Sequence, residues 1–540
     1  MKKINGVIWL FIIFSFALAI VSCSSSDDNT VTDPISMTDL VIADDFNFTT
    51  HRDVEVTFRA LYAGVFYIYD MEDNLLKKGR IDLDDGYQGV VSIPNDVNDV
   101  KLYFSEVEDL EAVYTITGDI IDYDFYPPSE EEERGGGTRC EDQIHPILEC
   151  IEHLGDGLFL AHFGYRNDYD VVQQIPIGPM NKLQNTPNQD MGQPTVFDPG
   201  RHVDVFTVEF PGDGYRDDEI FYIKWKLGGT LGEGFARADS ISTECPRGVF
   251  DDDDNDGVLN DDDDFPYDET RAFLNHFPAT DSLTLNWGTL AFEDLWPLMG
   301  DYDFNDVIIN YRFETVDDPS DYLLEVYGYF TLRASGASYE NGFAIEMPFL
   351  TGNVETLTFT PELNGNGIIS GDNSAIVKFF SNALEVMNKP ENSTFVNTQI
   401  SDPYLDPVNF EFYLKLTEAV DESTFPWLEP PYNPFIIVDQ VTGKEIHLPD
   451  MPPTILADPT LFGTDDDDSN PGSDRYYKTA TNLPWAINLP IEWTYPLERI
   501  QIIDAYNYVD DWAESSGDIY NDWFENNEGY IVEENLYLAP

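Results

Sequence analysis

Hydrophobic and polar residues alternate along much of the chain, which is the two-residue period of a half-buried β-strand. Residues 54–60 (VEVTFRA) and 410–416 (FEFYLKL) show the alternation most clearly. Clusters of Asp, Asn, Gly and Pro interrupt it at short intervals, as turns between strands do. We therefore predict a mostly β, multidomain fold. The expected strands cover residues 54–60, 64–69, 89–93, 100–104, 112–116, 158–165, 175–178, 200–210, 223–227, 282–287, 307–313, 324–332, 354–359 and 410–416, and one or two helices are expected, at 374–387 and 505–515.

Breaks in this pattern divide the chain into modules. The run PPSEEEERGGG at residues 127–137 combines proline, like charges and glycine, which is typical of a linker. Short strands on both sides of it predict two small β-sandwich modules, and the chain beyond residue 271 predicts one large β-rich domain. The predicted parts are a tether at 23–37, a β-sandwich module at 38–128, a linker at 129–137, a second β-sandwich module at 138–250, an acidic loop at 251–270 and a C-terminal domain at 271–540.

The first residues have the features of an export signal. Lys2 and Lys3 precede an almost wholly apolar run at residues 7–21. A signal anchor is the alternative, because such a run approaches the lower length limit of a membrane span. The sequence IVSC, which ends at Cys23, resembles a bacterial lipobox and implies a signal peptide at 1–22 and lipid attached to the Cys23 thiol. The Ser/Asp tract that follows is similar to signals that send Gram-negative lipoproteins to the outer face of the outer membrane.

The charge balance is extreme, with 102 Asp and Glu residues against 28 Lys and Arg and a formal net charge of −74 at pH 7. The sequence therefore predicts no nucleic-acid partner, because phosphate binding requires clustered cations. Hydrophobic residues make up 42% of the chain and aromatic residues 14%, which is enough to build folded cores, so a disordered acidic protein is not expected. We interpret most of the negative charge as a solvated surface suited to a salty medium.

One acidic stretch, DDDDNDGVLNDDDD at residues 251–264, has the register of a calcium loop. Aspartates occupy alternate positions, and Gly257 stands sixth, where such a loop must turn sharply. A solvated acidic linker is the alternative. The predicted calcium ligands are Asp252, Asp254, Asp256, the backbone carbonyl of Val258, Asn260 and Asp263.

The same stretch resembles a thrombospondin type 3 repeat, because no amphipathic helix follows it as one would in an EF-hand. The resemblance implies a structural Ca²⁺ ion rather than a sensor. Asp263 at the twelfth position is shorter than the Glu usually found there, which predicts a weak site with a Kd of about 10⁻⁴–10⁻³ M.

A second group of oxygen-bearing side chains lies at residues 301–306 (DYDFND), directly before a predicted strand. Carboxylates at alternate positions favour a hard cation such as Ca²⁺, and Glu293 or Asp294 could complete the site from the preceding turn. The alternative is an Asx-turn network, in which these side chains accept hydrogen bonds from backbone amides. The predicted ligands of a second metal are Asp301, Asp303, Asn305 and Asp306.

Three cysteines follow Cys23, namely Cys140, Cys150 and Cys245. An odd number permits one disulfide and one free thiol. We predict a Cys150–Cys245 disulfide, which would join the two ends of the second module, with Cys140–Cys150 as the alternative. The segment also resembles a β-sandwich module of bacterial surface proteins that has a cysteine near each end, and this resemblance favours the first pairing.

Several motifs of the C-terminal region occur together. They are KEIHLP at 444–449, FGTDDDDSNPG at 462–472, NLPWAINLP at 482–490 and DDWAESSG at 510–517. With the acidic segment before residue 307, these motifs resemble the LruC domain family over about residues 273–523. The resemblance implies a surface lipoprotein in which a thrombospondin-type calcium loop precedes the domain. It implies no reaction and therefore no catalytic residues.

Together these features predict a lipid-anchored, calcium-binding cell-surface protein that binds an external glycan or protein ligand and is not an enzyme. In this hypothesis two β-sandwich modules form a stalk, and Ca²⁺ fixes the angle between the stalk and the C-terminal domain. One alternative is a secreted hydrolase that uses Glu293, Asp301 and Asp303. Another is a structural component of a surface assembly. The sequence contains no Gly-x-Ser-x-Gly, His-Glu-x-x-His or phosphate-loop motif that would indicate an enzyme class.

Overall fold

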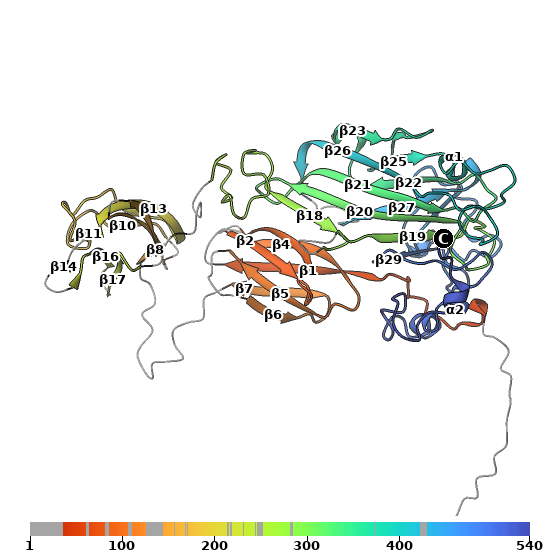
Figure 1. Ribbon diagram of the computed structural model, residues 1–540, viewed down its shortest axis with the longest axis horizontal. Coiled ribbons are helices and arrows are strands. Elements are labelled where there is room, and N and C mark those ends of the chain that lie inside the picture. The colour runs from red at the N-terminus through yellow and green to blue at the C-terminus, as the bar shows by residue number, and fades with distance from the viewer. Residues whose placement is uncertain are drawn as a thin grey trace, which may run out of the picture.

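The chain folds into three β-sandwich units, which confirms the predicted mostly β, multidomain fold (Figure 1). The computed structural model describes residues 36–540 except 61–63, 82–85, 106–110, 126–143, 156, 168, 170, 213–214, 217–218, 230–231, 243–244, 246–251, 281–284, 372 and 422–428. The predicted signal peptide, Cys23, Cys140 and the predicted linker lie outside these residues. Within the described part of the chain, no helix has the length and apolar character needed to cross a membrane.

The first unit is a sandwich of two sheets. Its described strands are β1 (His51–Ala60), β2 (Gly64–Tyr69), β3 (Leu75–Ile81), β4 (Tyr87–Pro94), β5 (Asp99–Phe104), β6 (Glu111–Thr115) and β7 (Ile120–Phe125). They form the sheets β4-β1-β7 and β3-β2-β5-β6. The alternation of β1 explains the packing, because Val54, Val56 and Phe58 are buried between the sheets while Glu55 is exposed.

The second unit is also a sandwich. Its described strands are β8 (Ile144–Gly155), β9 (Leu158–Asn167), β10 (Gln173–Gln174), β11 (Asn181–Gln184), β12 (Val196–Phe197), β13 (Gly200–Pro211), β14 (Tyr215–Arg216), β15 (Glu219–Ile220), β16 (Tyr222–Gly229) and β17 (Gly232–Asp239). The sheets β13-β9-β8 and β11-β16-β17 share a core around Phe163 and Trp225. A disulfide joins Cys150 on β8 to Cys245, which follows β17.

The C-terminal unit is the largest of the three. The strands of this unit are β18 (Phe273–Phe277), β19 (Gly288–Phe292), β20 (Val307–Asp317), β21 (Leu323–Ala334), β22 (Gly342–Met347), β23 (Val354–Thr360), β24 (Gly367–Ser370), β25 (Ala375–Phe380), β26 (Val408–Val420), β27 (Asn433–Ile437), β28 (Glu445–His447) and β29 (Ala486–Leu489). They form a large sheet, β23-β26-β21-β20-β19-β29 with β18 paired to β20, and a smaller sheet, β24-β25-β22-β27-β28. One hydrophobic core lies between the two sheets. The short helices are α1 (Ala383–Val386), α2 (Ile502–Ala505) and α3 (Val509–Glu514), with 3₁₀ turns at Met37–Asp39, Thr351–Asn353, Val438–Gln440, Pro471–Ser473 and Glu533–Asn535.

Four predicted elements differ from the structure. The segment 374–387 is strand β25 followed by the single turn α1, because its apolar residues pair with β22 and β24 and pack into the core. The helix predicted at 505–515 is confirmed in part as the shorter helix α3, and α2 precedes it. Residues 175–178 form no strand, since Pro176 has no N–H to donate to a sheet. Of the strand predicted at 282–287, the described residues 285–287 form no strand, and β19 begins at Gly288.

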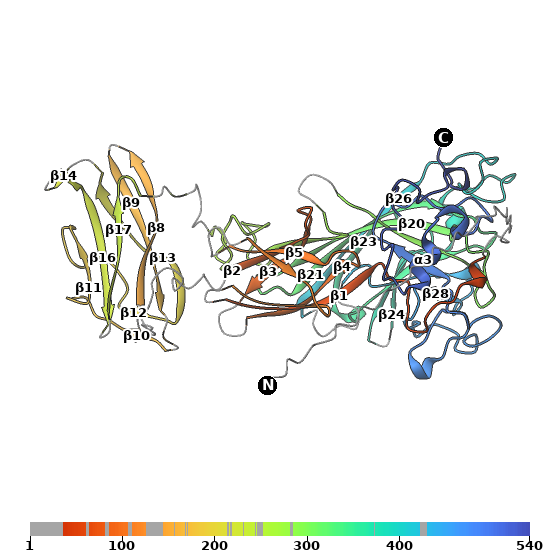
Figure 2. The same cartoon turned by 90° about the horizontal axis from the view of Figure 1, so that it is seen from below.

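The first unit lies against the C-terminal unit (Figures 1 and 2). Strand β3 runs beside β18, and the backbone N–H of Leu75 donates to the carbonyl of Thr280 at 3.0 Å. The backbone N–H of Lys78 donates to Asn275 Oδ1 at 3.0 Å. The second unit stands apart from the other two in both views. A stalk of two modules in series, as predicted, is therefore wrong for the first module.

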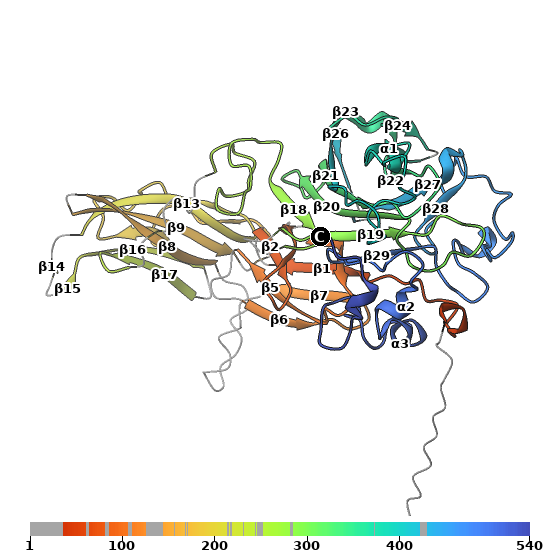
Figure 3. The same cartoon turned by 45° about the vertical axis from the view of Figure 1, so that its right-hand side comes forward.

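A strap formed by residues 36–48 is part of the C-terminal unit (Figure 3). Met37 is buried, and the rings of Phe46 and Phe48 pack edge-on against Trp512 of α3, with centroids 5.1 and 5.7 Å apart. These side chains belong to a hydrophobic cluster on the face of the large sheet opposite the main core. The described chain therefore enters the fold at the C-terminal unit before it reaches β1.

Candidate cation sites

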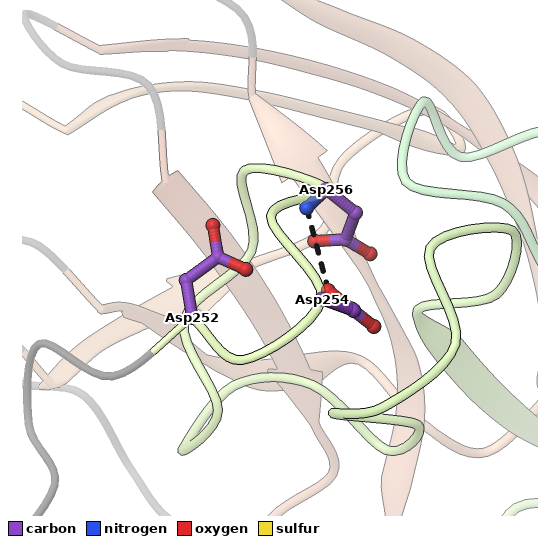
Figure 4. Close-up of side chains that lie close together, drawn as sticks. All are labelled: Asp252, Asp254 and Asp256. Atoms are coloured by element: carbon purple, nitrogen blue, oxygen red, sulfur yellow. Dashed lines mark hydrogen bonds between the residues drawn. The ribbon is translucent and has the colours of Figure 1, made fainter.

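The acidic loop at residues 252–263 is folded by its own carboxylates. Asp252 accepts hydrogen bonds from the backbone N–H groups of Asn255 at 2.7 Å and Gly257 at 3.2 Å. Both of those residues have left-handed torsions, with φ of 63° and 91°, which asparagine and glycine tolerate best. The sharp turn expected at the sixth position is present, and the carboxylates of Asp252, Asp254 and Asp256 lie within 4.8 Å of one another (Figure 4).

Three aspartates of this loop each have one buried carboxylate oxygen without a hydrogen-bond partner among the described residues. These oxygens are Oδ2 of Asp254, Asp256 and Asp263. The other oxygen of each accepts the backbone N–H two residues further along the chain, at 2.7–3.3 Å. A buried, unpaired carboxylate oxygen costs free energy unless a cation or a proton balances it. The loop therefore offers three oxygens suited to a hard cation.

The carboxyl of Asp263 lies close enough to the same group to be affected by its charges. Burial raises the pKa of its carboxyl to about 6, with further contributions from the charges of Asp256 and Asp254. Burial also raises the pKa of Asp256, and Asp254 and Asp252 add to the effect. A divalent cation would reverse this, since it favours the charged form of every carboxylate that it contacts.

The predicted side-chain ligand Asn260 has other contacts in this structure, and Val258, whose backbone carbonyl is the predicted ligand, is held through its side chain. The side chain of Asn260 accepts the backbone N–H of Asp253 at 3.0 Å and donates to Asp253 Oδ2 at 3.2 Å. The side chain of Val258 is buried in a small cluster with Val65 of β2 and Phe273 of β18. The predicted carboxylates thus come together, while Asn260 closes the loop and Val258 fixes it to its surroundings.

The loop contacts both the first unit and the C-terminal unit. The phenol of Tyr67 on β2 contacts Asp262, and the ammonium group of Lys78 on β3 forms an ion pair with Asp264. Asp264 also accepts the backbone N–H of Leu274 on β18 at 2.6 Å. No sequence pattern near the loop identifies Tyr67 and Lys78, because they lie far from it along the chain.

The second acidic segment, residues 301–306, lies in the connection between β19 and β20. Its side chains alternate between a hydrophobic cluster and a group of carboxylates. Tyr302 and Phe304 are buried in the cluster that also contains Trp512, and Asp301 and Asp303 alternate with them. Both aromatic residues have left-handed torsions, with φ of 60° and 50°. Such torsions cost about 1–3 kcal/mol each and persist where the surroundings fix them, often at functional sites.

The carboxylates of Glu293, Asp301 and Asp303 lie within 4.8 Å of one another. Glu293 and Asp303 are each 1% exposed, and Asp301 is exposed. Glu293 Oε1 accepts the backbone N–H of Phe304 at 2.8 Å, and the oxygens of Asp303 accept the backbone N–H groups of Asn305 at 3.1 Å and Arg499 at 2.6 Å. Backbone amides thus orient the carboxylates, as the Asx-turn alternative predicts, but Glu293 Oε2 is buried without a hydrogen-bond partner in the described part of the chain.

Burial and mutual repulsion disfavour charge in this group. Burial, followed by the charges of Asp303 and Asp301, raises the pKa of Glu293 well above its ordinary value. Burial and the Asp301 charge raise the pKa of Asp303 to about 8. Without a cation, ionising all three carboxyl groups therefore costs free energy.

The other predicted ligands of this segment face elsewhere. Asp306 accepts the backbone N–H of Asp294 at 2.8 Å, and the Asp294 carboxylate accepts an amide N–H of Asn341 at 2.8 Å. These two aspartates form a separate pair, with Asp294 buried and Asp306 half-buried. The side-chain carbonyl of Asn305 is buried without a partner among the residues that the structure describes, and its amide donates to the carbonyl of Pro496 at 3.1 Å.

A further carboxylate near the cluster comes from a distant part of the chain. Burial raises the pKa of Glu498 to about 7, and the charge of Asp301 contributes. A Cβ placed on Gly336 would lie 2.0 Å from Asn305 Oδ1 and 3.1 Å from Glu498 Oε2, so both oxygens approach this glycine closely. No local pattern in the sequence marks Glu498 as a neighbour of Asp301.

The large sheet also carries a groove of about 590 Å³ over β20, β21 and β26. The guanidinium of Arg312 lies 4.1 Å from the ring centroid of Tyr329 and 5.3 Å from that of Trp287. Arg333 and Asn409 also line the groove. These residues come from three separate strands and from Trp287, which precedes β19, so no local sequence pattern predicts the groove.

Comparisons with known proteins give one family match and one structural similarity. Residues 321–524 match the family described as a domain of unknown function (DUF4842). The chain is similar to the crystal structure of a putative lipoprotein from Bacteroides ovatus, with a TM-score of 0.41 and 17% identity over 59% of this chain and 91% of that one. No curated protein matches the chain. The matched family segment begins after both candidate cation sites and includes Glu498.

Proposed function

We propose that this chain is a lipid-anchored, calcium-binding protein of the bacterial outer surface that binds an extracellular ligand and is not an enzyme. The observation that supports calcium binding is the group of three buried, unpartnered oxygens of Asp254, Asp256 and Asp263. Ca²⁺ prefers carboxylate and carbonyl oxygens, and the loop supplies them from the register expected of a calcium loop. Its role is structural, since the loop contacts two β-sandwich units rather than a pair of mobile helices.

Ligand binding is supported by the groove on the C-terminal unit. Its lining combines aromatic rings with hydrogen-bonding groups, namely Trp287, Tyr329, Arg312 and Asn409. Sugars are bound by surfaces of this kind, because rings contact their apolar faces while polar side chains bond their hydroxyl groups. The proposed ligand is therefore a glycan.

The hydrolase alternative is disfavoured by the burial of its carboxylates. Glu293 and Asp303 are each 1% exposed, so a substrate has little access to them. One oxygen from each of Glu293, Asp301 and Asp303 lies within 4.8 Å of the others, which suits oxygens that share one cation.

The lipid anchor rests on the lipobox at Cys23. Metabolic labelling with a fatty acid analogue should label the chain in bacteria and should not label a Cys23→Ser variant. An equally labelled variant would show that the lipid is attached elsewhere.

Calcium binding by the loop is tested by calorimetric titration of the full chain with calcium chloride. The D254N/D256N variant should lose the event assigned to the loop, and its melting temperature should gain less on calcium addition. Asp261→Asn is the matched control, because Asp261 is an exposed aspartate of the same loop and is not a predicted ligand. A normal titration by D254N/D256N would refute the assignment.

The ligand is tested by screening the calcium-loaded chain on a glycan array. Arg312→Ala should abolish the binding found there, whereas Tyr322→Ala, which changes an exposed aromatic residue outside the groove, should not. Binding that survives Arg312→Ala would place the ligand on another surface.

A further inference from the structure

We propose that Glu293, Asp301 and Asp303 form a second Ca²⁺ site, separate from the loop at residues 252–263. The site lies in the connection between β19 and β20, within the C-terminal unit. It goes beyond the proposed function, which requires only the loop. Either site can bind calcium if the other does not.

The three carboxylates come from a short stretch that the fold turns back on itself. Glu293 directly follows β19, and Asp301 and Asp303 precede β20. Their oxygens lie within 4.8 Å of one another, a spacing that allows each to contact one central ion at the 2.3–2.6 Å typical of calcium. Each carboxylate oxygen has two lone pairs, so an oxygen that accepts a backbone N–H can still bind a cation.

The unpartnered oxygen of Glu293 points to a ligand independently of the acidic cluster. Glu293 is 1% exposed, and its Oε1 is satisfied by the backbone N–H of Phe304. Its Oε2 has no hydrogen-bond partner among the described residues. A Cβ on Gly300 would lie 1.7 Å from this oxygen, so the chain approaches it as closely as only glycine permits.

The charge of Arg499 acts on the exposed edge of the cluster, where it lowers the pKa of Asp301 while burial, the larger effect, raises it. Arg499 contributes its backbone N–H to Asp303, while its guanidinium is 73% exposed and forms an ion pair with Glu498 at 3.8 Å. A buried carboxylate group of this charge is stabilised by a bound metal ion or by protons. A divalent ion would balance two of the three charges.

The ligand chemistry favours calcium. Carboxylate oxygens are hard ligands, and the exposed position of Asp301 leaves one side of the site open to water molecules that complete the coordination. Magnesium requires a nearly ideal octahedron and gives up its water reluctantly, so we expect weaker binding of Mg²⁺.

Such an ion would hold two distant segments together. Asp303 accepts the backbone N–H of Arg499, and the carbonyl of Tyr302 accepts the backbone N–H of Ile502 at 2.8 Å. The ion would thereby tie the strained 301–304 segment to the chain that leads into α2. Its expected role is to stabilise this end of the C-terminal unit.

The test uses the full chain carrying D254N/D256N, so that the loop does not contribute. Calorimetric titration with calcium chloride should still show one binding event, and addition of E293Q/D301N should weaken it at least tenfold. Asp465→Asn, which removes an exposed aspartate from the neighbouring acidic loop, is the control and should leave binding unchanged. Absence of calcium binding in D254N/D256N, or undiminished binding after E293Q/D301N, would overturn the proposal.

Folding is checked in the same variants without metal. Glu293→Gln retains the Oε1 acceptor for Phe304 and removes one of three mutually repelling charges, so the metal-free melting temperature should not fall. If E293Q/D301N nevertheless melts lower, Asp301→Asn alone provides the test, because the Asp301 carboxylate is exposed. Terbium luminescence sensitised by aromatic residues should fall in parallel with calcium affinity, and luminescence equal to that of the parent would overturn the assignment.

Discussion

The phenolic O–H of Tyr67 on β2 donates a hydrogen bond to Asp262 Oδ1 at 2.8 Å, so the first β-sandwich contacts the acidic loop directly. Val65, two residues earlier on the same strand, is buried with Val258 of the loop. On its other side the loop contacts β18 through Asp264. The loop therefore adds to the direct contact between β3 and β18 in holding the first unit on the C-terminal unit.

Tyr67→Phe should weaken this contact. The substitution removes the hydrogen bond and leaves Asp262 half-buried without that donor, for an expected loss of about 1–2 kcal/mol in the free energy of unfolding. Urea unfolding followed by intrinsic fluorescence measures the change. Tyr69→Phe is the matched control, because Tyr69 stacks on the same ring but has no hydroxyl hydrogen bond to a described residue. Equal losses in both variants would show that the hydroxyl of Tyr67 does not contribute.

Removal of calcium should affect the units unequally. Chelation would leave the loop carboxylates without a cation and weaken the contact between the first and C-terminal units. The second unit has its own core and disulfide, so its transition should not move. Differential scanning calorimetry with and without EDTA distinguishes the transitions. A uniform shift of all transitions would contradict a calcium effect confined to the loop and the Glu293 site.

The stability of the metal-free protein should fall as the pH rises from about 4 to about 8. The folded-state pKa values of Asp303, about 8, and Glu498, about 7, lie above the value of about 4 expected in the unfolded chain. The folded state therefore binds protons more tightly in this range. Its advantage is complete below about pH 4 and is lost as the pH passes through 7 and 8.

Calcium should reverse this trend, because it binds the deprotonated carboxylates. Melting temperatures recorded from pH 5 to pH 8, in EDTA and in calcium, test both statements. Asp303→Asn should flatten the profile in EDTA. A metal-free profile that rises with pH would contradict the inferred direction.

Loss of the disulfide should destabilise the second unit. Cys150 and Cys245 are 95 residues apart, and the chain-entropy model gives about 4–5 kcal/mol for closing a loop of that length. A double Cys→Ser variant should therefore lower the transition of the second unit and leave the others in place. Urea unfolding of the oxidised protein and the variant measures the difference, and an unchanged midpoint would count against the entropic contribution.

Gly300→Ala should disrupt the Glu293 cluster. The added methyl group would collide with Glu293 Oε2 and displace either the carboxylate or the turn. We expect a loss of about 1–3 kcal/mol in stability, together with weaker calcium binding. Gly352→Ala is the control, since a Cβ at that position meets nothing within 4 Å. Similar behaviour of the two variants would remove the argument for a tight cradle around Glu293.

The sequence allowed local features to be predicted better than the contacts between them. Alternation located β1 and β26 because each has one buried and one solvated face, which is a property of neighbouring residues. It failed at 374–387, where β25 is buried on both faces and its apolar run has no two-residue period.

The candidate sites divide in the same way. The spacing of Asp252, Asp254 and Asp256 is encoded locally, and the structure brings their carboxylates together. Glu498 and Tyr67 reach the two sites through tertiary packing that no spacing encodes. Proximity in sequence groups Asp306 with Asp303, but at the start of β20 the side chain of Asp306 turns toward Asp294.

The strap at residues 36–48 determines which unit would bear a force applied at the N-terminus. Met37 and Phe46 are buried against the C-terminal unit, so a chain anchored at Cys23 would transmit tension first to the largest unit. That unit would sit next to the membrane, and the second unit, which stands apart in Figures 1 and 2, would be free to reach outward. Under shear flow the strap would bear the force first, and it would detach from the C-terminal unit before the first sandwich is stretched.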